Sequence, residues 1–529
     1  MKCSLSSPNL VRQAYLLGLL LLAVGLTLSP FLMGLSQFWL VGVWIADGIV
    51  NRDFKQKWQA FSHNWVAVLL VSLYLMHLVG FGYSSDIQYA LKDLRIKMPL
   101  LLLPFVLSSM QPLSKKQFDL LLYVYVCSVL IATFRSFSLY VKHEYNDIRE
   151  IALHISHIRL CLNIVFCVFI TGYYLFKRQM PWWERALQIG VMAWLCYIIY
   201  IFESLSGYAA LCAGVGVTLL FCVFSWKKSL GFRIGVVAAF LIFALCAAFG
   251  AYRILKPWLE VEKVDVATLD KKTSQGNDYV HDTTYFLIED GRYCGLYYCE
   301  KELEATWPLR SDRDVNGETT NGESLWATLV RYLTSKGLRK DAEGVMALTD
   351  EDIVNIENGV ANYNNYIHPG VRARISSTLF EYNRYRRTNN PNGGSLSQRI
   401  EYTRASFHII GQHPWFGVGT GDVPEAYRQA YDALDSPLQE EFRHRAHNQY
   451  LAIAVGFGIV GLLLFLVVLL LPYLAQKRNR TYLYTIFLCI ILLSMFPEDT
   501  IETQAGVSLF AFFNALFLLA KPREEKLAE

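Results

Sequence analysis

The chain has 529 residues, of which 53% are hydrophobic and only 18% are charged. A soluble protein of this length carries about 25% charged residues, so this composition excludes an ordinary cytosolic enzyme. The net charge of +4 is too small to indicate nucleic-acid binding.

Long apolar runs predict about 12 transmembrane helices, because each span takes ~20 residues. The runs cover residues 13–33, 36–50, 64–82, 98–110, 117–140, 152–176, 187–203, 207–225, 232–254, 449–475, 480–496 and 503–520. We therefore expect an all-α polytopic membrane protein in three parts. These are an N-terminal membrane domain (1–254, about nine spans), a polar and mainly helical domain outside the membrane (255–446), and a C-terminal membrane domain (447–529, about three spans).

The distribution of basic residues predicts the orientation of the spans. With a cytoplasmic N-terminus, the inner loops and adjoining span ends hold nineteen Lys and Arg residues, whereas the short outer connections hold six. The positive-inside rule then places both termini in the cytoplasm and the polar domain outside. The first run has a basic flank but no evident small-residue cleavage site, so we expect an uncleaved signal-anchor.

Nine of the eleven cysteines lie in or beside the apolar runs, where they serve as small apolar residues. Only Cys294 and Cys299 fall in the polar domain. An oxidising compartment would let them pair, so we expect a disulfide that closes a very small loop. Zinc is the alternative, but no second Cys pair or close His pair completes a four-ligand site in the sequence.

Four segments of the polar domain have helix-like apolar spacing, namely residues 324–337, 349–360, 373–387 and 397–411. Thr349 and Asp352 approximate a capping arrangement before the second segment. The sequence NNPNGG (389–394) separates the third segment from the fourth. The domain is therefore expected to be a small helical cap with loops.

The first candidate for chemistry combines two arginines with a glycine-rich loop. Arg399 and Arg404 lie on the last predicted helix of the polar domain, and Gly417, Gly419 and Gly421 follow it. Such a loop could cradle an anion with its backbone. A plain helix-to-loop connection with a solvated arginine face is the alternative.

The second candidate is His447, which precedes Asn448 in the sequence RHRAHNQYL (443–451) at the start of the tenth run. An imidazole at a membrane boundary can act as a base near neutral pH. An interfacial belt of polar residues is the alternative.

Two further polar features lie at predicted outer span ends. Arg159 is near the start of the sixth run, where a cation faces a partner or a cavity or else snorkels to the interface. Glu498, Asp499 and Glu502 lie between the last two spans. They could bind a cation, pair with the arginines or form a solvated loop. Because all these clusters share the predicted outer side, we expect one site there, fed from the bilayer.

Two segments carry a resemblance to a known family. They read RIEYTRASFHIIGQHPWFGVGTGD (399–422) and AHNQYLAIAVGFGIVGL (446–462). In these segments and in its topology the chain resembles the O-antigen ligase and polymerase superfamily. The segment EDTIETQAGV (498–507) is similar to members from Bacteroides-like bacteria. Family members often have Ser-Arg-Gly where this chain has Ser206-Gly207-Tyr208, which leaves Arg159 as the main intramembrane cation.

The resemblance implies a membrane glycosyltransferase of GT-C-like architecture that needs no metal or other cofactor. The donor would be a glycan on undecaprenyl pyrophosphate. The acceptor would be a sugar hydroxyl of lipid A-core or another glycan, during lipopolysaccharide biosynthesis at the bacterial inner membrane with the polar domain periplasmic. His447 would be the base, Arg399, Arg159 and, more weakly, Arg404 would bind the pyrophosphate, and Gly417, Gly419, Asn448 and Glu498 would support the site.

Three alternatives stay open at this point. A polysaccharide polymerase would use a second lipid-linked unit as acceptor, and a protein O-oligosaccharyltransferase would use Ser or Thr. A secondary transporter belongs to a different class and should show related halves or helices broken at mid-membrane. The sequence shows no convincing repeat.

Overall fold

The computed structural model describes residues 7–142, 148–177, 179–225, 229–285 and 287–522. Cys3 and six of the nineteen basic residues counted above lie outside these ranges. The chain forms two compact units. The first consists of Met1–Trp226, Tyr402–Ser436 and Arg443–Glu529, and the second of Lys227–Glu401 and Pro437–Phe442. The boundaries expected at residues 254 and 446 mark where the chain should leave and re-enter the membrane, and they stay a prediction.

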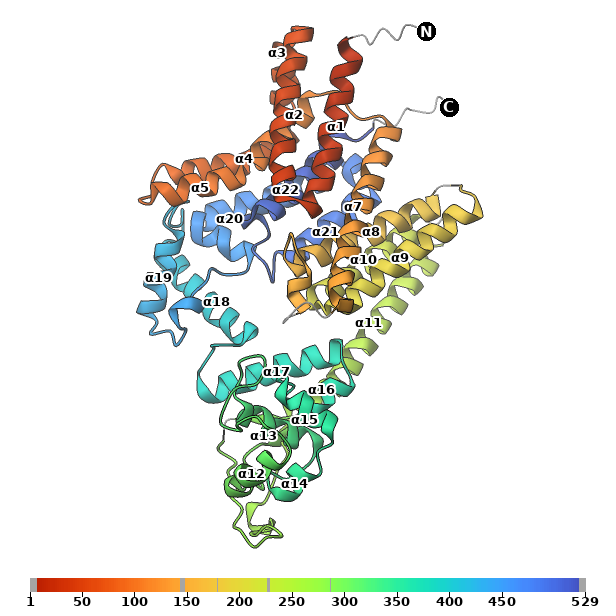
Figure 1. The fold of residues 1–529 in the computed structure, drawn as a ribbon. Helices are drawn as coiled ribbons and strands as arrows, with labels where there is room; N and C mark the ends of the chain where they lie inside the picture. Colours follow the sequence, from red (N-terminus) through yellow and green to blue (C-terminus); the bar gives the residue numbers. More distant parts are fainter. Residues whose placement is uncertain (1–6, 143–147, 178, 226–228, 286, 523–529) are drawn as a thin grey trace. The chain divides into compact units, whose positions relative to one another are not determined.

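Helices build the first unit (Figure 1). They are α1 (Ser7–Leu28), α2 (Pro30–Asn51), α3 (Phe54–Ser62), α4 (Trp65–Phe81), α5 (Ile87–Lys97), α6 (Pro99–Ser109), α7 (Lys115–Lys142), α8 (His157–Lys177), α9 (Trp182–Phe202), α10 (Leu205–Ser225), α19 (Val423–Ala433), α20 (Gln449–Ala475), α21 (Tyr482–Ser494), the short helix η6 (Thr500–Glu502) and α22 (Gln504–Ala515). The helix α18 (Ser395–Gln412) begins in the second unit and ends in the first.

Among the described residues, seven helices are long and apolar enough to cross a membrane, namely α1, α2, α7, α8, α9, α10 and α20. The pair α3 and α4, bent by 84°, makes an eighth if it is one span, whereas α21 and α22 are shorter apolar helices. Each of the twelve apolar runs overlaps a helix, although the run 13–33 crosses the break between α1 and α2 and the run 152–176 begins before α8. The all-α polytopic architecture is therefore confirmed, and the count of twelve spans stays a prediction.

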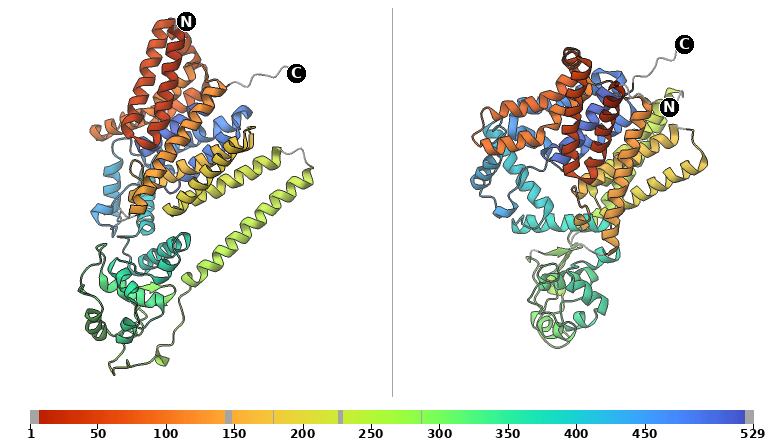
Figure 2. Two further views of the ribbon diagram at one scale, coloured as in Figure 1. Left: turned by 45° about the vertical axis from the view of Figure 1, so that its right-hand side comes forward. Right: turned by 45° about the horizontal axis from the view of Figure 1, so that its top comes forward.

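A tight turn joins α1 and α2, which run side by side in Figures 1 and 2. Ser29 caps α2 by accepting a hydrogen bond from the Leu32 N–H at 3.2 Å. A Cβ atom on Gly25 would lie 2.6 Å from the backbone nitrogen of Met33, so only glycine allows this approach.

The first unit has an aromatic core around α22. The Phe513 ring of α22 lies 5.0 Å from Phe166 of α8 and 5.3 Å from Phe487 of α21, measured between centroids. Every residue of α22 from Gly506 to Ala515 is buried. A helix that is apolar on all sides belongs inside a bundle. The helix α22 therefore packs against other helices rather than against lipid.

The described residues of the second unit form helices and one small hairpin, joined by loops. It contains α11 (Leu230–Leu259), β1 (Ile288–Glu289), β2 (Arg292–Tyr293), α12 (Glu300–Thr306), α13 (Leu325–Lys336), α14 (Ala342–Met346), α15 (Asp350–Glu357), α16 (Tyr363–Ile367) and α17 (Val371–Thr388). The four helices expected in the polar domain are confirmed as α13, α15, α17 and α18. The break at Asn389 is also confirmed, because this residue ends α17 in a left-handed conformation.

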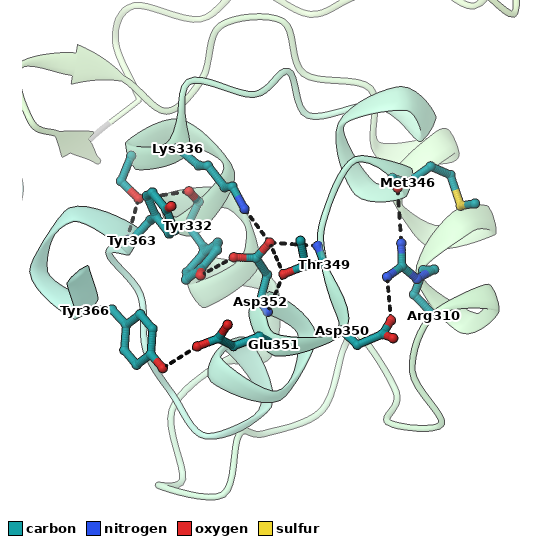
Figure 3. Close-up of polar contacts among 11 residues, drawn as sticks. Arg310, Tyr332, Lys336, Met346, Thr349, Asp350, Glu351, Asp352, Tyr363 and Tyr366 are labelled. Carbon is teal, nitrogen blue, oxygen red and sulfur yellow. Dashed lines mark hydrogen bonds and ion pairs between the residues drawn. The ribbon is translucent and has the colours of Figure 1, made fainter.

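The Asp352 carboxylate joins α13 to α15 (Figure 3). It accepts a hydrogen bond from the Tyr332 hydroxyl at 2.6 Å, another from the Thr349 N–H at 2.7 Å, and pairs with Lys336. The Thr349 hydroxyl accepts from the Asp352 N–H, so the expected cap is a complete capping box. Burial alone would raise the pKa of Asp352, but these donors lower it to about 2.

The predicted disulfide between Cys294 and Cys299 is wrong. Both thiols are free and buried. Cys294 packs in the apolar core of the second unit with Trp307 and Leu333, whereas Cys299 precedes α12 and donates its backbone N–H to the Lys340 carbonyl. Burial raises the pKa of the Cys294 thiol to about 12. The two residues therefore act as small packing residues in different surroundings.

Candidate active site

The N-terminus of α20 carries the His-Asn motif. Asn448 caps this helix, because its side-chain oxygen accepts a hydrogen bond from the Leu451 N–H at 3.1 Å. The Asn448 amide also donates to the Phe496 carbonyl at 3.0 Å. The Gln449 N–H donates to the Met495 carbonyl at 2.9 Å. The segment after α21 therefore fixes the start of α20.

His447 precedes this cap in a left-handed turn, with φ 46°. A non-glycine residue keeps such a conformation when its surroundings hold it there. Its Nδ1 atom lies 3.9 Å from Oδ1 of Asp499, and its ring centroid lies 5.5 Å from that of Tyr402. The His447 side chain is 36% exposed. The imidazole thus has a carboxylate near one nitrogen and an accessible edge.

Arg159 faces the same segment from the first turn of α8. Its Nη2 atom lies 3.8 Å from Oε2 of Glu498, and the two side chains are only 16% and 12% exposed. Within the described part of the chain, the Nε atom of Arg159 is buried without a hydrogen-bond partner. A guanidinium with a spare donor suits an anionic ligand. Arg159, His447 and the acidic segment therefore lie in one cluster, and its role as a binding and catalytic site stays a prediction.

The same residues could hold a metal ion. One ligand atom from each of His447, Glu498 and Asp499 lies within 4.8 Å of the others. Each carboxylate already faces a guanidinium, however. Glu498 faces Arg159, and Asp499 lies 3.8 Å from Nη2 of Arg445. The geometry therefore allows a cation here but does not need one to neutralise the carboxylates.

A buried group of charges supports the segment that carries His447. The Lys97 Nζ atom, which is fully buried, lies 2.7 Å from Oε2 of Glu502. Nη1 of Arg445 lies 3.3 Å from the same oxygen, and the Gln449 amide donates to the other Glu502 oxygen at 2.9 Å. Burial favours the neutral acid, but Lys97 and Arg445 hold the pKa of Glu502 well below its usual range. Glu502 therefore stays ionised and ties α5 to both sides of His447.

A small pocket opens beside this group of charges. Its walls include Tyr89, Asp93, Arg445 and Glu502. Tyr89 and Arg445 also contact each other, with the Tyr89 hydroxyl 3.3 Å from the guanidinium. Burial raises the pKa of Tyr89, so this hydroxyl remains a donor near neutral pH. The pocket offers polar groups of both signs next to the His447 segment.

The glycine-rich loop after α18 packs against α4 and α20. A Cβ atom on Gly417 would lie 2.4 Å from the backbone of α20, and one on Gly419 would lie 3.0 Å from the Gly80 carbonyl oxygen. The Gly417 N–H donates to the His413 carbonyl, and the Gly419 N–H donates to the Gly456 carbonyl at 2.9 Å. These two amides already have protein acceptors, so the structure gives both glycines a packing role beside the site.

Arg399 and Arg404 lie on α18 but in different units, Arg399 in the second and Arg404 in the first. Arg404 is exposed and follows Tyr402, whose ring contacts His447, by two residues. Arg399 is half-buried. A pyrophosphate-binding role for each stays a prediction.

Comparison with known proteins bears on this region. Residues 369–466, less than a fifth of the chain, match the family model described as O-antigen ligase. We call this matched segment the O-antigen ligase domain. The match begins just before α17 and ends within α20, so the domain includes Arg399, Arg404 and His447. The resemblance to the O-antigen ligase and polymerase superfamily is confirmed. No curated protein matches the chain.

Three residues that support the O-antigen ligase domain were not assigned from the sequence, namely Lys97, Arg445 and Glu502. In the sequence, Glu502 belongs to the acidic segment between the last two spans, and Lys97 is one of the six basic residues of the short outer connections. The available signal for each of these residues is a charge in a short connection between apolar runs. This signal does not show that Lys97 and Glu502 pair with each other, because they are far apart in the chain.

Proposed function

We propose that this protein transfers a glycan from undecaprenyl pyrophosphate to a sugar hydroxyl of lipid A-core, as an O-antigen ligase of the bacterial inner membrane. The O-antigen ligase domain and the apolar helices support the coarser description, a multi-pass membrane glycosyltransferase. One observation carries the finer proposal. Arg159 and His447 converge on the adjacent carboxylates of Glu498 and Asp499.

The guanidinium groups suit the donor end of this reaction. Pyrophosphate is a concentrated anion that accepts forked hydrogen bonds from arginine. Arg159 is largely buried and holds a spare donor at Nε among the described residues. Arg399 and Arg404, both within the matched domain, are the further pyrophosphate ligands of the proposal. Glu498 keeps the Arg159 side chain directed toward the acidic segment after α21.

The imidazole suits the acceptor end. The acceptor oxygen forms a bond to the anomeric carbon, and the bond from that carbon to the pyrophosphate oxygen breaks with its electron pair. His447 takes the acceptor proton, and the arginines stabilise the leaving pyrophosphate. Because Nδ1 of His447 lies toward Asp499, the proposal assigns proton uptake to Nε2. At 3.9 Å the carboxylate stabilises the imidazolium through its charge rather than through a hydrogen bond.

Metal independence is part of the proposal. The negative charge that develops on the pyrophosphate is matched by Arg159, and the site carboxylates face Arg159 and Arg445. Activity should therefore survive chelation of divalent ions. A strict requirement for such an ion would instead assign His447, Glu498 and Asp499 as its ligands.

The proposed orientation has cytoplasmic termini and a periplasmic site. Contacts within the first unit support the expected grouping of segments on two opposite sides, and the positive-inside rule then assigns the sides. Arg12 donates to Gln111 at 2.7 Å, and Lys521 donates to the Arg478 carbonyl, so segments expected on the inner side meet. The contacts of Lys97 with Glu502 and of Arg159 with Glu498 join segments expected on the outer side.

The acceptor decides between the ligase and the enzymes that share its chemistry. Full-length protein in nanodiscs would be given the lipid-linked glycan with lipid A-core, a second lipid-linked glycan or a Ser-containing peptide. Transfer to lipid A-core supports the proposal. Transfer only to the second glycan identifies a polymerase, and transfer only to the peptide identifies a protein O-oligosaccharyltransferase. Movement of the intact donor across the bilayer without transfer would indicate a transporter.

A further inference from the structure

The loop between α18 and α19 exposes two large aromatic side chains. Trp415 is 66% exposed and Phe416 is 65% exposed. Both lie in the sequence HPWFG (413–417). Exposed apolar surface is unfavourable in water by about 25 cal/mol per Å². A contiguous apolar pair on a surface loop therefore indicates a contact with something other than water.

This loop is fixed to the point where α20 breaks. Gly458 interrupts the helix with φ 63° and ψ −163°. The N–H groups of the next two residues, Ile459 and Val460, donate to the carbonyls of Pro414 and Trp415 at 2.8 and 3.3 Å. The Tyr83 hydroxyl, just after α4, donates to the Phe416 carbonyl at 2.7 Å. These bonds fix the backbone of Trp415 and Phe416 beside the break in α20.

The exposed apolar surface continues from the loop along α20. Seven side chains of this helix are 38–58% exposed, namely Ile459, Val460, Leu463, Val467, Leu470, Leu471 and Leu474. Their spacing of three or four residues places them on one face. The mean hydropathy of α20 reaches 3.0, the highest among the candidate spans. This face is therefore a lipid-facing stripe, and Trp415 and Phe416 lie at one end of it.

The length of α20 places the loop at a membrane surface. From Ile459 to Ala475 the helix rises ~25 Å at 1.5 Å per residue, and Lys477, Arg478 and Arg480 follow its end. The hydrocarbon core of a bilayer is ~30 Å thick. With the basic residues at one interface, the loop reaches the boundary of the other, where Trp is enriched.

We propose that Trp415 and Phe416 insert into the bilayer at this boundary and that phospholipid is their partner. The loop connects α18, which carries Arg404, to α19, so the insertion sets the height of the O-antigen ligase domain relative to the lipid headgroups. Only the identity of the leaflet, the periplasmic one, rests on the proposed function.

The proposal is tested by photo-cross-linking in the full chain. A benzophenone amino acid is placed at Phe416 in nanodiscs of phosphatidylethanolamine and phosphatidylglycerol, and lipid adducts are measured by mass spectrometry. Leu463 on the stripe is the positive control. Gln429, which is exposed on α19 beside Glu425, is the negative control. We expect adduct yields at Phe416 close to those at Leu463 and several-fold above those at Gln429.

A yield at Phe416 no higher than at Gln429 would overturn the proposal. Cross-linking to a protein, in native membranes and in place of lipid, would also overturn it and identify a protein-docking surface. The same measurement at Trp415 guards against a local effect of the substitution at Phe416. Because the readout needs neither donor nor turnover, a failure of glycan transfer leaves it unaffected.

Discussion

Oδ1 of Asp499 lies 3.9 Å from Nδ1 of His447. The next residue toward the N-terminus, Glu498, faces Arg159 instead. Two adjacent carboxylates therefore serve two different partners, one beside the proposed base and one beside the proposed pyrophosphate ligand. This division makes the two ends of the site separable by mutation.

Asp499→Asn should mainly lower kcat, by ~10-fold or more, because the imidazolium loses its stabilising charge during proton uptake. Glu498→Gln should mainly raise KM for the lipid-linked donor, because Arg159 loses the carboxylate that directs it. Steady-state kinetics of both variants in nanodiscs distinguishes the two roles. The same change in kcat and KM for both variants would contradict the division.

Arg159→Lys keeps a charge but loses the planar fork. We expect at least ~10-fold weaker donor binding, equivalent to about 1.4 kcal/mol. Binding of the lipid-linked pyrophosphate is measured directly, without acceptor. Arg185→Lys, at an exposed position early in α9, is the matched control and should bind normally. Full affinity of the Arg159 variant would remove this residue from the donor site.

Glu502→Gln should destabilise the first unit by about 3–5 kcal/mol, because it leaves the buried Lys97 ammonium without its carboxylate. Adding Lys97→Met should recover part of this loss. Because the pKa of Glu502 is depressed in the folded protein, its contribution is present above the ordinary value of ~4.3 and is lost as pH falls below it. Thermal unfolding in detergent should therefore show a difference between wild type and Glu502→Gln that is constant near neutrality and shrinks in acid. A difference that grows in acid would contradict this account.

Asp352→Asn should destabilise the second unit by about 2 kcal/mol. The amide that replaces the buried carboxylate accepts weaker hydrogen bonds from its several donors. The folded pKa of Asp352, about 2, lies below the ordinary value of ~3.9, so the wild-type advantage is lost as pH falls from ~4 toward 2. Alkylation of the buried Cys294 reports opening of this unit. Asp350→Asn, whose side chain is fully exposed, is the control and should leave the labelling rate unchanged. Equal labelling of both variants would show that the Asp352 contacts add no stability.

Local patterns were sufficient to predict much of the fold. The apolar runs anticipated all seven helices that are long and apolar enough to cross a membrane, because burial and membrane crossing both require continuous apolar sequence. Thr349 and Asp352 anticipated a capping box because its hydrogen bonds join residues three positions apart. The position of His447 before α20 could also be predicted from a local pattern, because Asn448 caps the helix that follows.

Long-range packing could not be predicted from the sequence. The contact between Lys97 and Glu502 joins α5 to η6, and no local periodicity encodes it. The spacing of Gly417 and Gly419 suggested an anion cradle, but a glycine pattern cannot show whether backbone amides already have acceptors. The disulfide prediction failed for a related reason. Short spacing permits pairing of Cys294 and Cys299, but the surrounding core decides where each side chain packs.

Glycan transfer by His447→Ala tests the central claim most directly. A general base contributes ~10²–10⁴-fold in rate, so the account predicts a loss of that size with donor binding retained. His444→Ala is the control, because His444 is exposed and its backbone carbonyl, rather than its ring, accepts the Tyr431 hydrogen bond. Both variants are compared with wild type in nanodiscs containing lipid-linked glycan and acceptor. Near-normal turnover by His447→Ala, or equal losses in the two variants, would contradict the assignment of His447 as the base.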